Sequence, residues 1–213
     1  MKFCRSAIAA AMILLSASSL SAQEIALKGG IAISKFETSG DVAFDDSFVS
    51  TSFGGHVRFR FGPIALQPEL HLVSRGASVS DDEMKQRLRL DYMEVPLMLV
   101  VPVHVGAFEP YVFGGPMLAL ETRCRNIIEE EGLTTNFGCD DDTLENSFDR
   151  GVFDYGATVG AGISRRLGSG RILLEARNTW GLRNIYDGEG DIEVRNRTML
   201  FSVGYAILPG SLD

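Results

Sequence analysis

Three features are scarce in this sequence of 213 residues. It has one tryptophan and three cysteines, and beyond residue 15 no apolar run approaches the roughly eighteen residues of a membrane-spanning helix. The longest such run, 95–105, is interrupted by two prolines and a histidine. Basic side chains are also few, with 20 against 28 acidic ones and a formal net charge of −8. An acidic chain does not attract nucleic acid, so we expect no nucleic-acid partner.

The N-terminus has the pattern of a secretory signal peptide. Two basic side chains and an apolar stretch at 7–15 precede a run of small residues, with cleavage expected after Ala22 or Ser21. The sequence therefore predicts a signal peptide at 1–22 and one mature domain at 23–213. Cleavage removes two basic and no acidic side chains, so the formal charge of the mature chain falls to −10.

The mature chain alternates with a period of two residues, which is typical of β-strands. Residues 49–61 place Val, Thr and Phe on one face and Ser, His and Arg on the other, and the pair Gly62-Pro63 then marks a tight turn. The same pattern predicts eight strands, at 24–36, 49–61, 64–72, 87–103, 110–121, 152–166, 171–182 and 195–207.

The length and composition of these strands favour a membrane. Strands of soluble proteins usually have about 5–6 residues, whereas tilted membrane strands need about 9–11. Glycine is frequent on the polar face, where a narrow closed barrel needs room for arginine and glutamate. The sequence predicts an all-β fold, an eight-stranded antiparallel up-and-down transmembrane β-barrel with long extracellular loops in the outer membrane. A soluble β-barrel is the alternative.

Short and long connections alternate along the chain, as in bacterial outer-membrane barrels with short periplasmic turns. The four long connections, at 37–48, 76–86, 123–151 and 184–194, carry a formal charge of −14 when Arg87 is counted with the second. The acidic loops are either simply solvated, or they bind divalent cations near lipopolysaccharide, or they bind a basic protein. We expect outer-membrane lipids and lipopolysaccharide as partners in any case.

The polar faces of the strands predict a structural network of charges inside the barrel. An eight-stranded barrel has an interior just wide enough for side chains to fill, so inward charges must pair. We expect Leu174 and Trp180 to face lipid, and Glu175 to pair inside the barrel. On the fourth strand, this register would turn Arg89 and Asp91 outward, so either they lie beyond the hydrocarbon band or a bulge shifts the register there. The predicted network comprises Arg58, Arg60, Glu69, His71, Glu94, Glu175 and Arg177.

The candidates for catalysis are weak. His56 and His71 lie on inward faces near Glu69, and His104 lies in a predicted turn. An enzyme acting on lipid A needs a serine and a histidine that face lipid, and this pair is missing from the predicted outward faces. No cysteine–histidine cluster has metal-ligand spacing, so we expect neither a metal nor another cofactor. The sequence predicts a non-enzymatic protein.

Two cysteines remain in the mature chain, Cys124 and Cys139, and both fall in the third long connection. Exported cysteines oxidise, so we predict a disulfide between them.

Several segments together resemble the PorT-like outer-membrane β-barrel proteins of diderm bacteria. They are 90–97 (LDYMEVPL), 110–116 (PYVFGGP), 154–162 (DYGATVGAG), 174–177 (LEAR) and 180–185 (WGLRNI). The resemblance implies an eight-stranded barrel, and in the best-known member a part in protein secretion. We expect a binding, structural or secretion-accessory role through acidic outward loops and periplasmic turns. A narrow porin-like channel and a lipid A-modifying enzyme remain alternatives.

Overall fold

The computed structural model describes residues 24–39, 46–80, 84–130, 133–138, 153–184 and 193–208. The predicted signal peptide lies outside these residues, so it stays a prediction. None of the described residues forms a helix that is long and apolar enough to cross a membrane.

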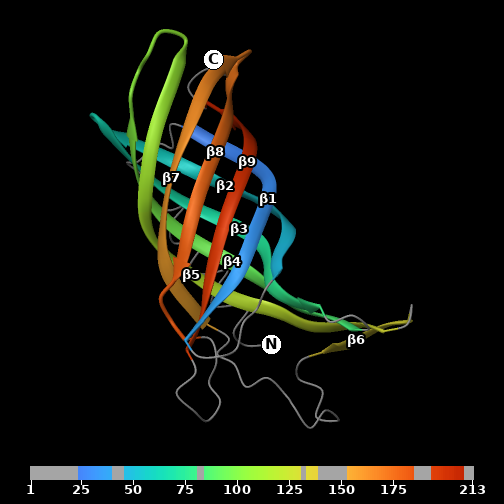
Figure 1. The fold of residues 1–213 in the computed structure, drawn as a ribbon. Helices are drawn as coiled ribbons and strands as arrows, with labels where there is room; N and C mark the ends of the chain where they lie inside the picture. Colours follow the sequence, from blue (N-terminus) through green and yellow to red (C-terminus); the bar gives the residue numbers. More distant parts are fainter. Residues whose placement is uncertain are drawn as a thin grey trace, which may run out of the picture.

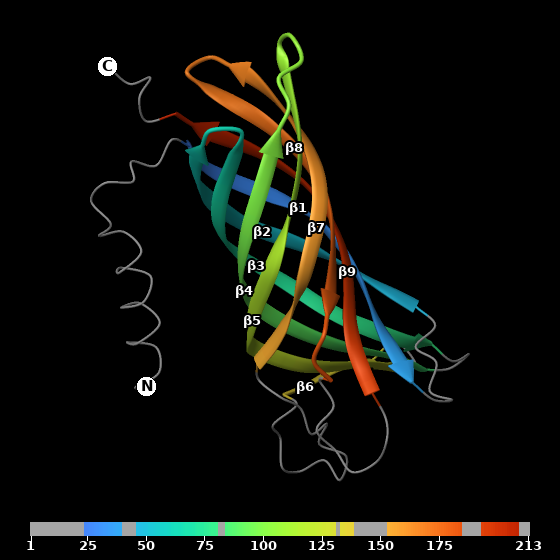
Figure 2. The same cartoon turned by 90° about the vertical axis from the view of Figure 1, so that its left-hand side faces the viewer.

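Eight long strands close into a barrel (Figures 1 and 2). Each pairs antiparallel with the next along the barrel wall, and the last pairs with the first to complete the ring. The predicted eight-stranded antiparallel up-and-down barrel is confirmed. The strands are β1 (Glu24–Ser39), β2 (Asp46–Phe61), β3 (Ile64–Ser80), β4 (Met84–Pro102), β5 (Phe108–Glu130), β7 (Phe153–Leu167), β8 (Gly170–Gly181) and β9 (Glu193–Ile207).

The short connections lie at one end of the barrel. Two residues join β2 to β3 and β7 to β8, and five join β4 to β5. Gly62, Gly106 and Gly168 have φ angles of 61°, 59° and 61°, a conformation that glycine adopts without steric cost. β1 begins and β9 ends at this same end, where Ile25 pairs with Ile207. Short turns and both chain ends are periplasmic in bacterial barrels, so we call the opposite end the outer end.

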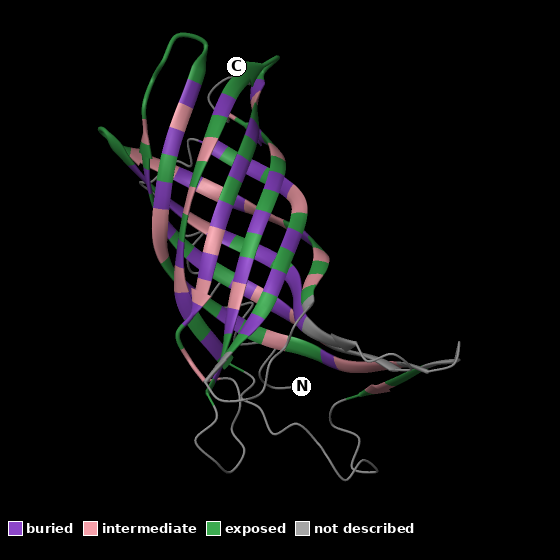
Figure 3. Ribbon diagram, viewed as in Figure 1, coloured by how far each residue is buried: buried purple, intermediate pink, exposed green. Residues whose placement is uncertain are grey.

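Buried and exposed residues alternate along each strand (Figure 3). The two faces of the barrel wall that result have opposite chemistry. The outward face is apolar and exposed: Leu174 on β8 is 54% exposed, and Trp180 also lies on this face. The inward face is polar and buried: Glu175 and Arg177 are 5% and 4% exposed. This arrangement is the reverse of that in a soluble protein, and it suits a barrel whose outer wall contacts lipid.

Glycines on the inward face make room for large neighbours. A Cβ at Gly162 on β7 would lie 2.5 Å from Cζ of Tyr111 on β5, and Gly160 is covered in the same way by the ring of Phe113. Any larger residue at these positions would displace an aromatic ring from the barrel interior.

The structure corrects the predicted connections. The stretch predicted as a loop at 76–86 is mostly strand, because β3 reaches Ser80 and β4 starts at Met84. In the same way β5 continues to Glu130 and a ninth strand, β6 (Leu133–Gly138), pairs with its end. β6 lies outside the barrel ring and projects with the end of β5 (Figure 1). Sequence alternation is lost here because the part of a strand beyond the lipid has no apolar face to present.

On β4, Arg89 and Asp91 face outward, next to an irregularity in the pairing with β5. The pairing with β5 shifts between Asp91 and Tyr92, since Asp91 pairs with Arg123 and Tyr92 with Glu121, which leaves Thr122 as the extra residue. The bulge lies on β5, so β4 itself keeps its alternation, with Tyr92 buried inside.

Candidate functional site: a charged barrel interior

A network of ion pairs fills the barrel interior. Among the described residues, six acidic and six basic side chains form these pairs, and all but two of the twelve are buried. All seven residues predicted from the sequence are among the inward-facing polar side chains. The acidic members are Glu24, Glu69, Glu94, Glu109, Asp154 and Glu175, and the basic ones are Lys28, Arg58, Arg60, Arg75, Arg171 and Arg177.

Four charges form the centre of the network. Lys28 Nζ on β1 lies 2.9 Å from Glu69 Oε1 on β3 and 2.9 Å from Glu175 Oε2 on β8. Arg177 contacts the same two carboxylates, at 2.8 Å for Glu175 Oε2. The Tyr111 hydroxyl donates to Glu175 Oε1 at 2.9 Å. The four charged side chains are at most 3% exposed, so this cluster spans the interior from β3 to β8 without contact with bulk water.

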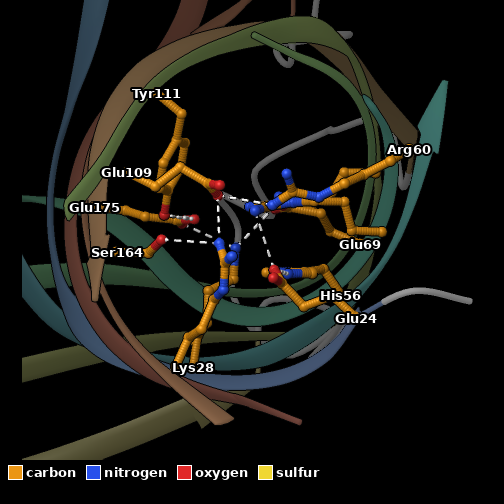
Figure 4. A network of polar contacts seen from close by, with 12 residues as sticks. Glu24, Lys28, His56, Arg60, Glu69, Glu109, Tyr111, Ser164 and Glu175 are labelled. Atoms are coloured by element: carbon orange, nitrogen blue, oxygen red, sulfur yellow. Dashed lines mark hydrogen bonds and ion pairs between the residues drawn. The ribbon is translucent and has the colours of Figure 1, made fainter. Parts of the chain in front are cut away.

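A second group of charges lies toward the periplasmic end. Arg60 Nη2 and Arg171 Nη1 both contact Glu109 Oε1, at 2.7 Å for Arg60. His104 Nε2, in the turn before β5, lies 2.8 Å from Glu109 Oε2. A single glutamate therefore joins β2, β5 and β8. Figure 4 shows Arg60 and Glu109 pointing toward each other inside the barrel.

Between these two groups, Glu24 binds two basic side chains of β2. Its Oε1 lies 3.0 Å from Arg58 Nη1 and 3.1 Å from His56 Nε2. Arg58 also donates to Gln67, and Gln67 donates to Glu69, which links this pair to the central cluster.

A third cluster lies toward the outer end. Arg75 on β3 pairs with Glu94 on β4 and, at 3.4 Å, with Asp154 on β7. Asn196 on β9 donates to Asp154 at 3.0 Å, and the Arg75 guanidinium lies 5.2 Å from the centre of the Tyr92 ring. Strands from opposite walls thus meet here as well.

Sequence reasoning missed several members of this network. Lys28 lies on the same inward face of the first strand as Ala26 and Gly30. The alternation of this strand was therefore the signal that could have identified it. Arg75 lies beyond the predicted third strand, whereas Asp154 lies on the polar face of the strand predicted at 152–166, so alternation could have identified it as an interior charge. Their pairing joins β3 to β7, two strands that are not adjacent in the barrel wall.

The histidines do not form a catalytic arrangement with a lipid-facing nucleophile. His56 binds Glu24 rather than Glu69, and His71 Nε2 lies 2.9 Å from Glu69 Oε2. Both rings are buried inside the barrel. In the described part of the chain, no group of three histidine, cysteine, aspartate or glutamate side chains is placed to hold a metal ion.

The structure places one of the two predicted disulfide partners. Cys124 is 7% exposed and lies within β5, not in a loop as expected, because β5 continues beyond the membrane band. Cys139 lies outside the described residues, so the disulfide stays a prediction.

Comparison with known proteins identifies the family. A family model described as "Outer membrane protein beta-barrel domain" matches residues 17–187. The chain belongs to this family. As an outer membrane protein beta-barrel domain, it is a small barrel of the bacterial outer membrane. No curated protein matches this sequence.

Several solved structures are similar to this outer membrane protein beta-barrel domain. Ail, the attachment invasion locus protein of Yersinia pestis, solved in complex with the heparin analogue sucrose octasulfate, has a TM-score of 0.46 and 14% identity, over 86% of this chain and 98% of its own. Neisserial surface protein A has a TM-score of 0.47 and 13% identity, over 86% and 96%. The N-terminal barrel domain of Pseudomonas aeruginosa OprF has a TM-score of 0.36 and 11% identity, over 87% and 98%.

Proposed function

We propose that this protein is a non-enzymatic outer-membrane barrel with a closed interior, which binds other proteins through its outer end and its periplasmic turns. The observation that carries the proposal is the central cluster. Lys28, Glu69, Glu175 and Arg177 bridge the interior with contacts of about 3 Å and are almost completely buried. A pathway for solutes would have to break these pairs, and an unpaired buried charge is strongly unfavourable.

The outer end supplies a surface for binding. β5 and β6 form a hairpin beyond the barrel wall, and in the described part of the chain β6 pairs with β5 only. Thr135 and Asn136 on β6 are exposed. A strand with one open edge can accept a strand of a partner protein through backbone hydrogen bonds. The acidic outer connections favour a partner with a basic surface.

The finer role that we propose is that of an accessory protein in secretion across the outer membrane. It rests on the sequence resemblance to the PorT-like proteins and on the exposed periplasmic turns, such as Val105 at 58% exposure. A secretion accessory would contact partners on both sides of the membrane, and this barrel presents surfaces at both ends.

Conductance in planar bilayers tests the closed interior. We expect the purified wild-type protein to give no steady conductance of porin size, because the central cluster fills the interior. Steady porin-sized conductance would favour the narrow channel instead.

Site-specific photo-crosslinking in cells tests the binding role. We expect a crosslinker at Asn136 on β6 to capture an extracellular or outer-membrane protein, and one at Val105 to capture periplasmic components of a secretion machine. A crosslinker at the lipid-facing Leu174 serves as the matched control. If neither end captures a protein beyond that control, the binding role is wrong.

Mass spectrometry of lipid A tests the enzymatic alternative. We expect the acylation of lipid A to be the same in a deletion strain and in its parent. A change in acylation that a His71→Ala variant reproduces would replace our proposal with a lipid A-modifying activity.

A further inference from the structure

The outward apolar surface ends at a sharp edge on three neighbouring strands. The last apolar row comprises Leu72 on β3, Met93 on β4 and Leu120 on β5, which pair side by side. Leu72 and Leu120 are 53% and 39% exposed, as expected for side chains in contact with lipid tails.

The next two rows toward the outer end are polar. Asp91 on β4 pairs with Ser74 on β3 and Arg123 on β5, and beyond it Arg89 pairs with Arg125. Two residues of strand correspond to about 7 Å, so the first polar row lies within about 7 Å of the last lipid-facing row along the strands. Polar rows directly beyond the last lipid-facing row are expected at the level of the outer-leaflet headgroups.

Positive charge exceeds negative charge in this group. The Asp91 carboxylate binds two guanidinium groups at once, with Oδ1 at 2.9 Å from Arg89 Nε and Oδ2 at 3.1 Å from Arg125 Nη2. Ser74 Oγ donates to Asp91 and accepts from Arg89 Nη2 at 2.8 Å. Arg123 is exposed and takes part in none of the ion pairs found among the described residues. Two arginines share one aspartate and a third lies beside them unpaired, so the group of three arginines and one aspartate has a net charge of +2.

The guanidinium groups also keep unused donors. Arg89 and Arg125 are 37% and 36% exposed, so part of each guanidinium group remains accessible to a ligand. Arginine presents its donors in a planar fork that matches the oxygen atoms of a phosphate. Asp91 and Ser74 hold two of these forks in place before any ligand binds.

We infer that Arg89, Arg123 and Arg125 form a binding site for a phosphate group of an outer-leaflet glycolipid, with Asp91 and Ser74 as positioning residues. A lipid-linked phosphate fits better than free phosphate, because the apolar row of Leu72 and Leu120 lies directly below and can contact the acyl chains. The acidic outer connections repel anions in general, so a soluble anion gains less here than one held at the membrane surface. This site does not depend on which protein the outer hairpin binds.

Native mass spectrometry of the full protein in detergent, with EDTA present to remove bridging cations, tests the site. The probes are bisphosphorylated lipid A, the same lipid with its phosphates removed, and inorganic pyrophosphate. We expect the wild-type protein to bind bisphosphorylated lipid A, the dephosphorylated lipid to bind about tenfold more weakly, and pyrophosphate not to displace the lipid.

The variant Arg123→Gln/Arg125→Gln should weaken binding of bisphosphorylated lipid A about tenfold or more. The matched control, Arg165→Gln/Arg166→Gln, removes the same charge from the periplasmic end of β7 and should leave binding unchanged. Heat-modifiable migration in gels verifies that both variants fold. Equal losses in the two variants, or equal binding of both lipids, would overturn the site. Displacement by pyrophosphate would show that the site binds phosphate from any source and would overturn its assignment to a glycolipid.

Discussion

The barrel interior and the outer arginine group use the same ion-pair chemistry with opposite charge balance. Inside, the ion-pair network joins six acidic with six basic side chains, and the central pairs are almost completely buried. Outside, Arg89 and Arg125 share Asp91 and remain about one-third exposed, and Arg123 beside them is exposed and has no ion pair among the described residues. Burial makes any unpaired charge costly, so the buried charges inside must be paired. A half-exposed site can keep excess charge, and it can therefore bind a ligand of opposite charge.

The largest expected effect comes from breaking the balance inside. Arg177→Leu removes one of the two basic side chains, Arg177 and Lys28, that bridge Glu69 and Glu175, which should lower the free energy of unfolding by about 3–5 kcal/mol. Urea unfolding in detergent, followed by the fluorescence of the single tryptophan, measures this change. The double variant Arg177→Leu/Glu69→Gln removes one charge of each sign and should recover part of the loss. If the single variant were as stable as the wild type, the interior would contain water that screens its charges.

The next effect concerns the lipid-facing wall. Leu174→Arg places a charge on the outward face of β8 and should destabilise the barrel by about 2–4 kcal/mol if it lies near the bilayer midplane. Leu167→Arg, at the periplasmic end of β7, is the matched control and should cost about 0–1 kcal/mol. The same unfolding assay in lipid vesicles compares them. Equal costs would contradict the assigned position of the membrane band.

The predicted disulfide between Cys124 and Cys139 should have a smaller effect, at most about 3 kcal/mol for a loop of this length. We expect unreduced mature protein to react with no thiol reagent and reduced protein to react at two positions. Mass spectrometry after labelling counts the modified cysteines. Two reactive thiols in the unreduced protein would refute the disulfide.

The smallest effect is expected for an exposed ion pair outside both regions. Arg195 lies 2.8 Å from Glu193 on β9, and the two side chains are 46% and 54% exposed. Solvent screens such a pair, so Arg195→Gln should change stability by less than about 1 kcal/mol. If Arg195→Gln lowered the free energy of unfolding as much as Arg177→Leu in the same assay, burial would not explain the difference between exposed and interior ion pairs.

Much of this architecture could be predicted because alternation reports the environment of each side chain. The outward Leu174 and the inward Glu175 differ in chemistry because one contacts lipid and the other a closed interior. The turn at Gly62 could be predicted for a similar local reason, since a tight turn needs a residue that accepts positive φ. The outer parts of β3, β4 and β5 could not be predicted, because beyond the membrane both faces of a strand can be polar.

The sequence by itself determined the number of membrane strands, their inward and outward faces and the end at which the turns are short, because each depends on a pattern within one segment. Only the tertiary structure decided which charges meet. Glu69 and Arg177 are 108 residues apart, and Lys28 and Glu175 are 147 apart. Their contact depends on the stagger between strands around the closed barrel, which no single strand encodes. The same holds for the arginine group, since a bulge on β5 brings Arg123 and Arg125 beside Asp91 on the neighbouring strand.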